Sequence, residues 1–391
     1  MLAYTFYETD GRVMRYAEAL AGDGADVEAI VLRREGQDKV EVINKVEVRR
    51  IQERIKNESG KFSYFFRIIK FFFRSMAVLT WRHIKKPYDL IHVHSVPDFE
   101  VFAAIFPKLF GAKVILDIHD IVPEFYAAKF KVGEKSLIFK LLKFIEWLSA
   151  AFSNHVIIAN ELWLKKITQR SVKMDKCSAY INYPDLSVFN HALKKPRDDD
   201  KFIMIYPGTL NHHQGLDIAI NALAKITNDA PQIELHIYGE GSAVPELQEL
   251  IKSLKLSDKV FLSSPLPIRD IAKIMANADV GIVPKRNDSF GGDAFSTKIL
   301  EFMALGIPVI CAGTRVDRHY FNETLLRFFK AEDVDDLARV MILSYKNRDE
   351  NNRLAANALK FAEQNSWDVK KHQYLELIRS LVSRQHESQC V

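Results

Sequence analysis

Short apolar runs alternate with stretches of helical apolar periodicity along almost the whole chain. In the first half, the runs predict buried strands at residues 2–6, 27–32, 90–94, 114–119 and 155–159, and the stretches predict helices at 13–21 and 136–152. Strands that alternate with helices favour a parallel sheet covered by helices, because parallel neighbours need a long crossover connection.

A charged segment interrupts this alternation near the middle of the chain. Residues 194–201 read Lys-Lys-Pro-Arg-Asp-Asp-Asp-Lys, and a charged stretch that contains proline is typical of a linker. The alternation then resumes, with strands expected at 202–206, 233–238, 260–262, 280–283 and 308–311 and helices at 216–226, 244–254, 268–276 and 297–305. The pattern predicts an α/β protein with two Rossmann-like, doubly wound domains, 1–193 and 201–365, and a C-terminal helix, 366–391.

The composition agrees with a folded protein that has more than one core. Apolar residues make up 48% of the 391 residues and charged residues 27%, which is the profile of a globular chain. The three cysteines, Cys177, Cys311 and Cys390, are scattered and form no CxxC pair, which favours ordinary thiols in a reducing compartment. The first residues have strand character rather than signal-peptide order, and no apolar run reaches the roughly 20 residues of a membrane span, so we expect a cytoplasmic protein.

Residues 61–86 form a basic aromatic segment with seven basic residues and no acidic one. Arg67, Lys70 and Arg74 recur at helical spacing, so a helix here would have a cationic face with aromatic side chains over the rest. Such a helix can lie on the inner face of an anionic membrane, or it can pack into the core with a solvated basic edge. Nucleic acid is not an expected partner, because the net charge is only +5 and no nucleic-acid module is recognisable.

Candidate binding residues follow the predicted strands, because open parallel sheets bind ligands beyond the carboxyl ends of their strands. In the first domain these positions hold Asp10, Arg12, His119, Asp120 and Glu124. In the second domain they hold Gly208, Thr209, Gly239 and the segment 285–301.

The segment 285–301 is a long polar loop that leads into a helix starting at Ser296 or Thr297. The free backbone amides at such a start attract anions, and Arg286 and Lys298 add two cationic donors suited to phosphate oxygens. Glu301 lies one turn further along and can accept hydrogen bonds from sugar hydroxyls. This combination of groups favours a diphosphate that carries sugars.

Four segments carry a resemblance to a known family: 10–20, 117–124, 207–217 and, most specifically, 296–310, which begins Ser-Thr-Lys-Ile-Leu-Glu. The chain resembles, over essentially its whole length, the retaining glycosyltransferases of family 4. The resemblance implies the GT-B fold, in which two Rossmann-like domains face a central cleft.

The resemblance also implies roles for particular residues. Glu301 matches a glutamate that holds the nucleotide ribose, Asp293 stands where a second acid contacts the transferred sugar, and His119 matches a histidine beside the reacting centre. Thr209 and Gln214 replace the arginine and lysine that grip the diphosphate in many members, so Lys298 and Arg286 are expected to take that part. The expected catalytic set is His119, Asp293 and Glu301; the donor set Gly208, Thr209, Gly239, Arg286, Ser296, Thr297, Lys298 and Glu301; the acceptor set Asp10, Arg12, Asp120 and Glu124.

The implied reaction moves a hexose-type sugar from a uridine or guanosine diphosphate donor to a saccharide or lipid-linked acceptor, with retention of configuration, in surface polysaccharide synthesis. No cofactor or metal is expected, because fixed cations can neutralise the diphosphate. Three alternatives stay open: a non-catalytic sugar-nucleotide-binding relative, a nucleotide-sugar epimerase, and a metal-dependent hydrolase. The hydrolase would use the imidazoles and carboxylates of 92–94 and 117–120.

Overall fold

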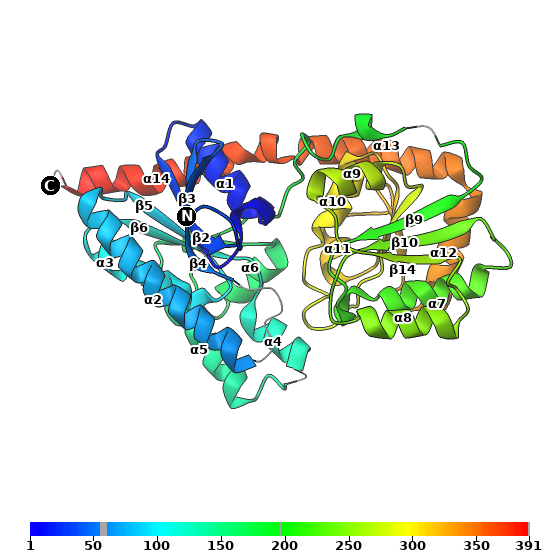
Figure 1. Cartoon of the computed structure of the whole chain (residues 1–391), viewed down its shortest axis with the longest axis horizontal. Helices are drawn as coiled ribbons and strands as arrows, with labels where there is room; N and C mark the ends of the chain where they lie inside the picture. The colour runs from blue at the N-terminus through cyan, green and yellow to red at the C-terminus, as the bar shows by residue number, and fades with distance from the viewer. Residues whose placement is uncertain (55–60, 131, 196, 390–391) are drawn as a thin grey trace. The chain divides into compact units, whose positions relative to one another are not determined.

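The computed structural model describes residues 1–54, 61–130, 132–195 and 197–389, and it divides into two compact units. Unit 1 comprises Met1–Asn182 and Lys371–Val391, and unit 2 comprises Tyr183–Lys370 (Figure 1). The boundary therefore lies before the predicted linker at 194–201, of which residue 196 is outside the described residues. That segment is bound to unit 2, because the Lys195 amide donates to Asn277 and Arg197 pairs with Asp279 at 3.0 Å.

Unit 1 is built on an eight-stranded sheet with the order β3-β4-β2-β1-β5-β6-β7-β8. The strands are β1 (Leu2–Ala3), β2 (Val27–Arg33), β3 (Val40–Ile43), β4 (Val46–Glu53), β5 (Leu90–His94), β6 (Lys113–Ile118), β7 (His155–Ile158) and β8 (Cys177–Ala179). All neighbouring pairs are parallel except β3 with β4. The predicted first strand is cut short, and the 3-10 helix η1 (Tyr7–Thr9) follows it.

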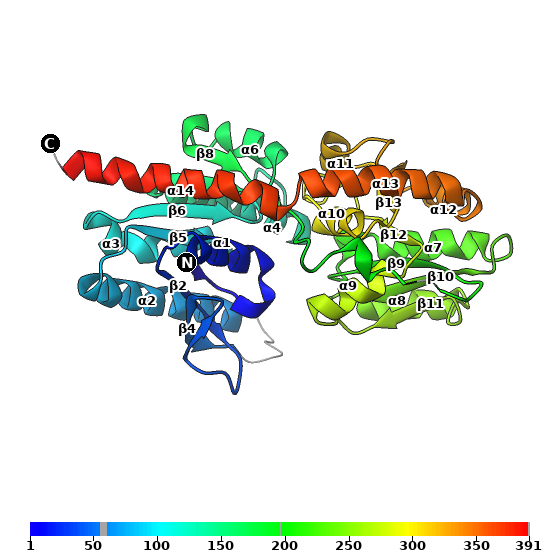
Figure 2. The same ribbon diagram turned by 90° about the horizontal axis from the view of Figure 1, so that it is seen from above.

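Helices cover both faces of this sheet (Figures 1 and 2). They are α1 (Gly11–Gly22), α2 (Lys61–Lys85), η2 (Asp98–Ala104), α3 (Ile105–Leu109), α4 (Val122–Phe130), α5 (Leu137–Phe152) and α6 (Glu161–Thr168). Asp10 starts α1, since its carboxylate accepts from the amides of Arg12 and Val13 at 3.2 and 3.1 Å. Ser136 and Asn160 cap α5 and α6 in the same way.

The last helix, α14 (Trp367–Gln389), belongs mainly to unit 1. Its Trp367 amide donates to the Pro184 carbonyl in unit 2, and from Lys371 onward the residues group with unit 1. Tyr374 anchors this part, because its fully buried ring stacks on Tyr16 of α1 at 4.2 Å and its hydroxyl meets His92 at 2.9 Å.

Unit 2 contains a six-stranded parallel sheet with the order β11-β10-β9-β12-β13-β14. Its strands are β9 (Phe202–Pro207), β10 (Ile233–Tyr238), β11 (Val260–Ser263), β12 (Val280–Val283), β13 (Val309–Ala312) and β14 (Arg327–Phe329). Its helices include α7 (Leu216–Ile226), α8 (Val244–Ser253), α9 (Ile268–Ala276), α10 (Thr297–Ala304), α11 (Arg315–Tyr320), α12 (Val334–Lys346) and α13 (Arg348–Gln364). The predicted fold class, two doubly wound α/β domains, is confirmed.

Candidate functional site

The amino end of α10 offers polar groups that a ligand could bind. Ser296 precedes the helix in extended conformation, and its side chain makes no capping hydrogen bond. The Ser296 hydroxyl oxygen is buried without a hydrogen-bond partner among the described residues. The amides of a helix's first turn also lack partners within the helix, so this end offers a cluster of donors, including those of Thr297 and Lys298.

Two glycines bring the backbone close to this helix end. A methyl group on Gly208 would lie 3.1 Å from Cε and 3.3 Å from Nζ of Lys298, and Gly208 has a φ of +134°. A methyl group on Gly239 would lie only 1.8 Å from the Gly208 carbonyl oxygen. A side chain is thus excluded at Gly239 and strained at Gly208, and the turns after β9 and β10 pack against each other beside Lys298.

Lys298 is a half-buried cation without a carboxylate partner among the described residues. Its ammonium lies over the Tyr206 ring, 4.9 Å from the ring centre. Burial lowers the pKa of Lys298 to about 8, against the opposing effect of the Glu301 charge. An anion at this position would restore the ordinary preference of the amine for its charged form.

The other predicted phosphate ligand, Arg286, is already paired inside unit 2. Its guanidinium donates to Asp217 at 2.6 Å and to the His212 carbonyl at 3.2 Å. It therefore holds the loop after β9 through these two contacts, and its part in gripping the diphosphate stays a prediction. The preceding residue, Lys285, is also occupied, since it is buried and pairs with Asp317 at 2.9 Å.

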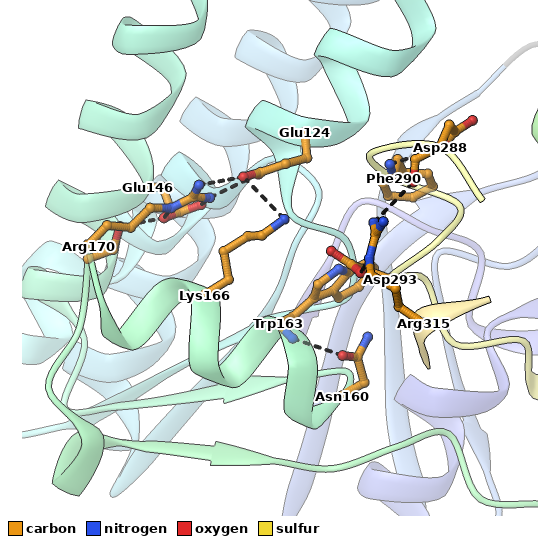
Figure 3. A network of polar contacts seen from close by, with 11 residues as sticks. Glu124, Glu146, Asn160, Trp163, Lys166, Arg170, Asp288, Phe290, Asp293 and Arg315 are labelled. Atoms are coloured by element: carbon orange, nitrogen blue, oxygen red, sulfur yellow. Dashed lines mark hydrogen bonds and ion pairs between the residues drawn. The ribbon is translucent and has the colours of Figure 1, made fainter. Parts of the chain in front are cut away.

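Acidic side chains of the polar loop before α10 stabilise the loop by hydrogen bonds and an ion pair. The Asp288 carboxylate accepts from the Phe290 and Gly291 amides at 2.9 and 2.6 Å. Asp293 is nearly buried and pairs with Arg315 at 2.7 Å, as Figure 3 shows. Sequence reasoning missed Arg315, which follows β13 and gave no motif signal.

The remaining predicted donor residues lie in the same region of unit 2. Thr209 is exposed, and its carbonyl accepts from the Tyr206 hydroxyl at 3.0 Å. Gln214 bonds to its neighbour His213 at 2.9 Å, so neither Thr209 nor Gln214 supplies a cation here. Glu301 is half-buried on α10, one turn beyond Lys298.

In unit 1, the predicted catalytic residue His119 belongs to a network centred on Asp117. His119 follows β6, and its Nε2 lies 3.3 Å from Asp117 Oδ2 and 3.2 Å from Nδ1 of His94. Asp117 is fully buried, and Arg12 donates to both of its oxygens at 2.8 Å. Although burial favours the neutral acid, the charge of Arg12 and the neighbouring imidazoles hold the pKa of Asp117 well below its usual range.

Three of the four predicted acceptor ligands have other partners within unit 1. Arg12 is buried between Asp117 and the Tyr180 carbonyl, and Asp10 caps α1. Glu124 is buried and pairs with Arg170 through both oxygens (Figure 3). These contacts give Arg12, Asp10 and Glu124 structural roles, and their contact with an acceptor stays a prediction.

Asp120 differs from the other three predicted acceptor ligands. It is half-buried next to His119, and its carboxylate has no hydrogen bond or ion pair within the described part of the chain. Burial raises the pKa of Asp120, while the proximity of His119 lowers it. Asp120 is thus the predicted acceptor residue that remains available to a ligand.

The same network contains a candidate metal-ligand set of His92, His94 and Asp117. All three are buried, and Nε2 of His92 lies 3.7 Å from Asp117 Oδ2. However, the guanidinium of Arg12 already neutralises Asp117 and occupies both of its oxygens. The arrangement is explained by an ion pair that positions imidazoles, and it does not require a cation.

Two families match the chain, one over each unit. Residues 11–179 match the glycosyl transferase 4-like domain, and residues 189–361 match the glycosyl transferases group 1. The chain is 28% identical over 190 residues to a D-inositol 3-phosphate glycosyltransferase from Thermomonospora curvata, a match that covers 46% of this chain and 42% of the relative. The alignment therefore spans less than half the length of that curated relative.

Solved structures resemble the whole chain at low sequence identity. Sucrose-phosphate synthase from Thermosynechococcus elongatus has a TM-score of 0.80 at 17% identity, and 98% of each chain is covered. Anabaena Alr3699/HepE in complex with UDP-glucose has a TM-score of 0.73 at 17% identity, with 97% of this chain and 98% of that chain covered.

The fold and the two family matches together define a class, the glycosyltransferases of the GT-B fold. Within this class the chain belongs to glycosyltransferase family 4, which confirms the resemblance seen in the sequence.

Proposed function

We propose that this protein transfers a hexose-type sugar from a nucleoside diphosphate sugar, and that unit 2 binds the donor. The observation that carries the proposal is Lys298, a half-buried cation without a carboxylate partner among the described residues, set at the amino end of α10. Helix amides and a lysine together suit a diphosphate, whose charge would offset the burial that lowers the pKa of Lys298 to about 8.

The donor contacts follow from the positions of the other side chains. The Ser296 hydroxyl is buried and free to bond to a phosphate oxygen. Glu301 would hold ribose hydroxyls, and Asp293, fixed by Arg315, would bind hydroxyls of the transferred sugar. The Gly208 backbone lies close to the Lys298 side chain, so a ligand bound to Lys298 would also lie near Gly208. We favour uridine diphosphate because Anabaena Alr3699/HepE, a structural neighbour, binds UDP-glucose.

We propose that transfer proceeds on one face of the sugar, with retention of configuration. The bond between the anomeric carbon and the β-phosphate oxygen breaks, a bond from the acceptor oxygen to that carbon forms, and the acceptor proton passes to the leaving phosphate. Lys298 and the α10 amides would stabilise the charge that builds on the diphosphate. His119, held by Asp117, would orient the sugar, and Asp120 would bind the acceptor.

We further propose a cytoplasmic enzyme of surface polysaccharide synthesis whose acceptor is a saccharide or a lipid-linked saccharide. This part rests on the family and on the fact that the Thermomonospora curvata relative is itself a glycosyltransferase, and not on a contact in the structure. No cofactor or metal enters the proposed reaction, since Lys298 and the helix end supply the positive charge.

A transfer assay tests the proposal. The full chain is incubated with UDP-glucose, UDP-N-acetylglucosamine or GDP-mannose and a bacterial lipid and saccharide extract, and free nucleotide and labelled product are measured. We expect one donor to be consumed, and Lys298→Met to lower the rate about a hundredfold or more, because it removes stabilisation of the leaving group. Lys252→Met, at a lysine whose side chain is 71% exposed, is the matched control and should leave the rate unchanged.

One structural observation favours a second candidate, a sugar-nucleotide-binding protein without activity. Thr209 and Gln214 stand where many members of the family have two cations. Among the described residues, Lys298 is then the lysine without a carboxylate partner at the amino end of α10. A single cation could bind the diphosphate without stabilising the leaving group enough for fast transfer. Nucleotide binding that Lys298→Met abolishes, with no consumption of any donor, would favour that candidate and contradict the transferase.

A further inference from the structure

The exposed apolar side chains of unit 1 gather on three helices. Helix α2 buries Ile68, Phe71 and Leu79 on one side. On its other side it exposes Phe66 at 68%, Phe73 at 57%, Trp81 at 53% and Ile84 at 67%. Seven-, eight- and three-residue steps keep these four on one side of the helix. The predicted basic aromatic segment thus both packs into unit 1 and presents aromatic rings outward; the side chains of Lys61, Phe62 and Tyr64 lie outside the described ones.

Helix α5 carries a second apolar stripe that faces outward. Its members lie at steps of four, three and four residues: Leu137 at 83% exposure, Leu141 at 53%, Phe144 at 56% and Leu148 at 40%. The opposite side of the helix is buried through Phe139, Glu146 and Ser149. Among the described residues of unit 1, none covers this apolar stripe.

The two helices belong to one layer of unit 1 (Figure 1). Helix η2 contacts both, since Phe99 lies 5.9 Å from Phe72 of α2 and Phe102 lies 5.1 Å from Phe152 of α5. Helix α3 adds two more exposed side chains to the layer, Leu109 at 77% and Phe110 just beyond it at 66%. The exposed stripes of α2 and α5, with these two residues, are called the α2–α5 face below.

The charges on the α2–α5 face have one sign. The sequences of α2, α3 and α5 contain a single acid, Glu146, which is buried against Arg170. The following basic side chains have no carboxylate partner within the described part of the chain: Lys70, Arg74, Lys85, Lys140 and Lys143. A groove of about 900 Å³ between α2 and β4 is lined by basic groups that include Lys70 and Arg74, and also by Glu53, which pairs with Arg33.

We propose that the α2–α5 face docks on an anionic phospholipid bilayer. The aromatic and leucine side chains would enter the boundary between headgroups and acyl chains, while the lysines and arginines bind lipid phosphates. None of the described helices has both the length and the apolar character of a bilayer span.

A bilayer fits this face better than a second copy of the chain does. Two copies joined through the face would bring lysines and arginines together without any acid to pair them, which disfavours association. Protein interfaces are also depleted of lysine at their centre, whereas anionic headgroups supply the missing negative charge.

Vesicle partitioning of the full chain tests the proposal. Vesicles of phosphatidylcholine alone are compared with vesicles of phosphatidylcholine mixed with phosphatidylglycerol. We expect partitioning only into the anionic vesicles, about fivefold weaker for each basic charge removed in Lys70→Gln with Arg74→Gln. Leu141→Ser with Phe144→Ser should lower it about tenfold or more, because two inserted side chains are lost. The matched control, Leu266→Ser with Ile268→Ser, changes apolar side chains of unit 2 that are 40% and 54% exposed and should have no effect.

Tryptophan quenching adds a readout that does not depend on stability. Brominated lipids should quench Trp81 and Trp147, which are 53% and 46% exposed, while the buried Trp163 stays unquenched. Equal partitioning of the α5 variant and its control would overturn the proposal. So would a concentration-dependent dimer, detected by light scattering, that the α5 variant abolishes. Failure of the transfer assay with intact partitioning would leave the docking proposal standing, because the α2–α5 face contains none of the residues proposed to bind donor or acceptor.

Discussion

Two charged residues with opposite surroundings, the buried Asp117 and the half-buried Lys298, show how individual residues act in this protein. Asp117 lies among donors, with Arg12 on both oxygens, so its charge is fully compensated inside unit 1. Lys298 lies beside a helix amino end and has no carboxylate partner among the described residues. The nearby charges of Glu301 and Asp317 offset the effect of burial on its pKa only in part. The first pattern is that of a structural ion pair, and the second supports the proposed binding site for an anion.

The titration of Lys298 gives a prediction on nucleotide binding. Its pKa of about 8 in the free protein should rise when a diphosphate binds, so binding takes up a proton near that pH. Affinity for uridine diphosphate should be constant below the free pKa and fall as the pH rises above it. Calorimetry near pH 8 in buffers of different ionisation enthalpy should show uptake of about half a proton per site.

Lys298→Arg is the matched control for this prediction. Arginine keeps the positive charge but does not titrate in this range, so binding should persist while proton uptake disappears. Unchanged proton uptake in Lys298→Arg would mean that another group titrates on binding.

The Arg12–Asp117 pair gives a prediction on stability. Asp117→Asn would leave a buried guanidinium without its counter-charge and should lower the free energy of unfolding by about 3–5 kcal/mol. Since the pKa of Asp117 is depressed in the folded protein, its contribution is present above its unfolded pKa of about 3.9 and is lost as the pH falls toward the folded value. Chemical denaturation near neutral pH measures the loss. Glu249→Gln, at a pair whose side chains are 71% and 78% exposed, should cost below about 1 kcal/mol, and equal losses would contradict the assignment.

At the scale of elements, the strand ends and helix starts of unit 2 matter most. The turns after β9 and β10 are so close that Gly239 excludes a methyl group, which would meet the Gly208 carbonyl at 1.8 Å. This contact holds the Gly208 backbone beside Lys298 and couples the geometry of the two turns to the proposed donor site.

Gly208→Ala should weaken nucleotide binding more than it lowers stability. The added methyl group would press on Lys298 Cε at 3.1 Å, and the φ of +134° disfavours alanine. Isothermal titration and thermal unfolding of the same sample separate the two effects. Gly22→Ala is the control, because no atom lies within 4 Å of its added methyl group. Unweakened binding in Gly208→Ala would contradict the contact with the donor site.

Sequence periodicity predicted most helices and strands, but it could not tell whether the apolar stripe of a helix is buried in the core or exposed. The helix expected at 136–152 is Leu137–Phe152, yet its most regular apolar stripe, from Leu137 to Leu148, is exposed. The β3–β4 hairpin was missed, because its turn residues Asn44 and Lys45 adopt positive φ without the glycine that usually marks such a turn.

At the scale of the whole molecule, the alternation of strands and helices was enough to predict two doubly wound sheets. The division between units was harder to predict, since charge alone suggested a linker at 194–201 although contacts tie that segment to unit 2. The stacking of Tyr374 of α14 on Tyr16 of α1 joins residues far apart in the chain, and no local sequence pattern predicts such a contact.

Only part of the candidate site was predictable from the sequence, again because local patterns do not report contacts between residues far apart in the chain. The residues around the start of α10, including Ser296 and Lys298, form one continuous motif, and the structure presents them together. Arg12, Glu124 and Arg286 were each expected to meet a ligand, but each is paired with a distant acid or base of its own unit. Sequence position gives the end of a strand, whereas the partner of a charged side chain depends on tertiary packing.

Calorimetric titration with uridine and guanosine diphosphates in the absence of added metal tests the central claim most directly. Our account predicts micromolar binding of one nucleotide, with uridine favoured, and its loss in Lys298→Met but not in Lys252→Met. Absence of binding to the folded wild-type chain, or binding that Lys298→Met leaves unchanged, would contradict a donor site at the amino end of α10.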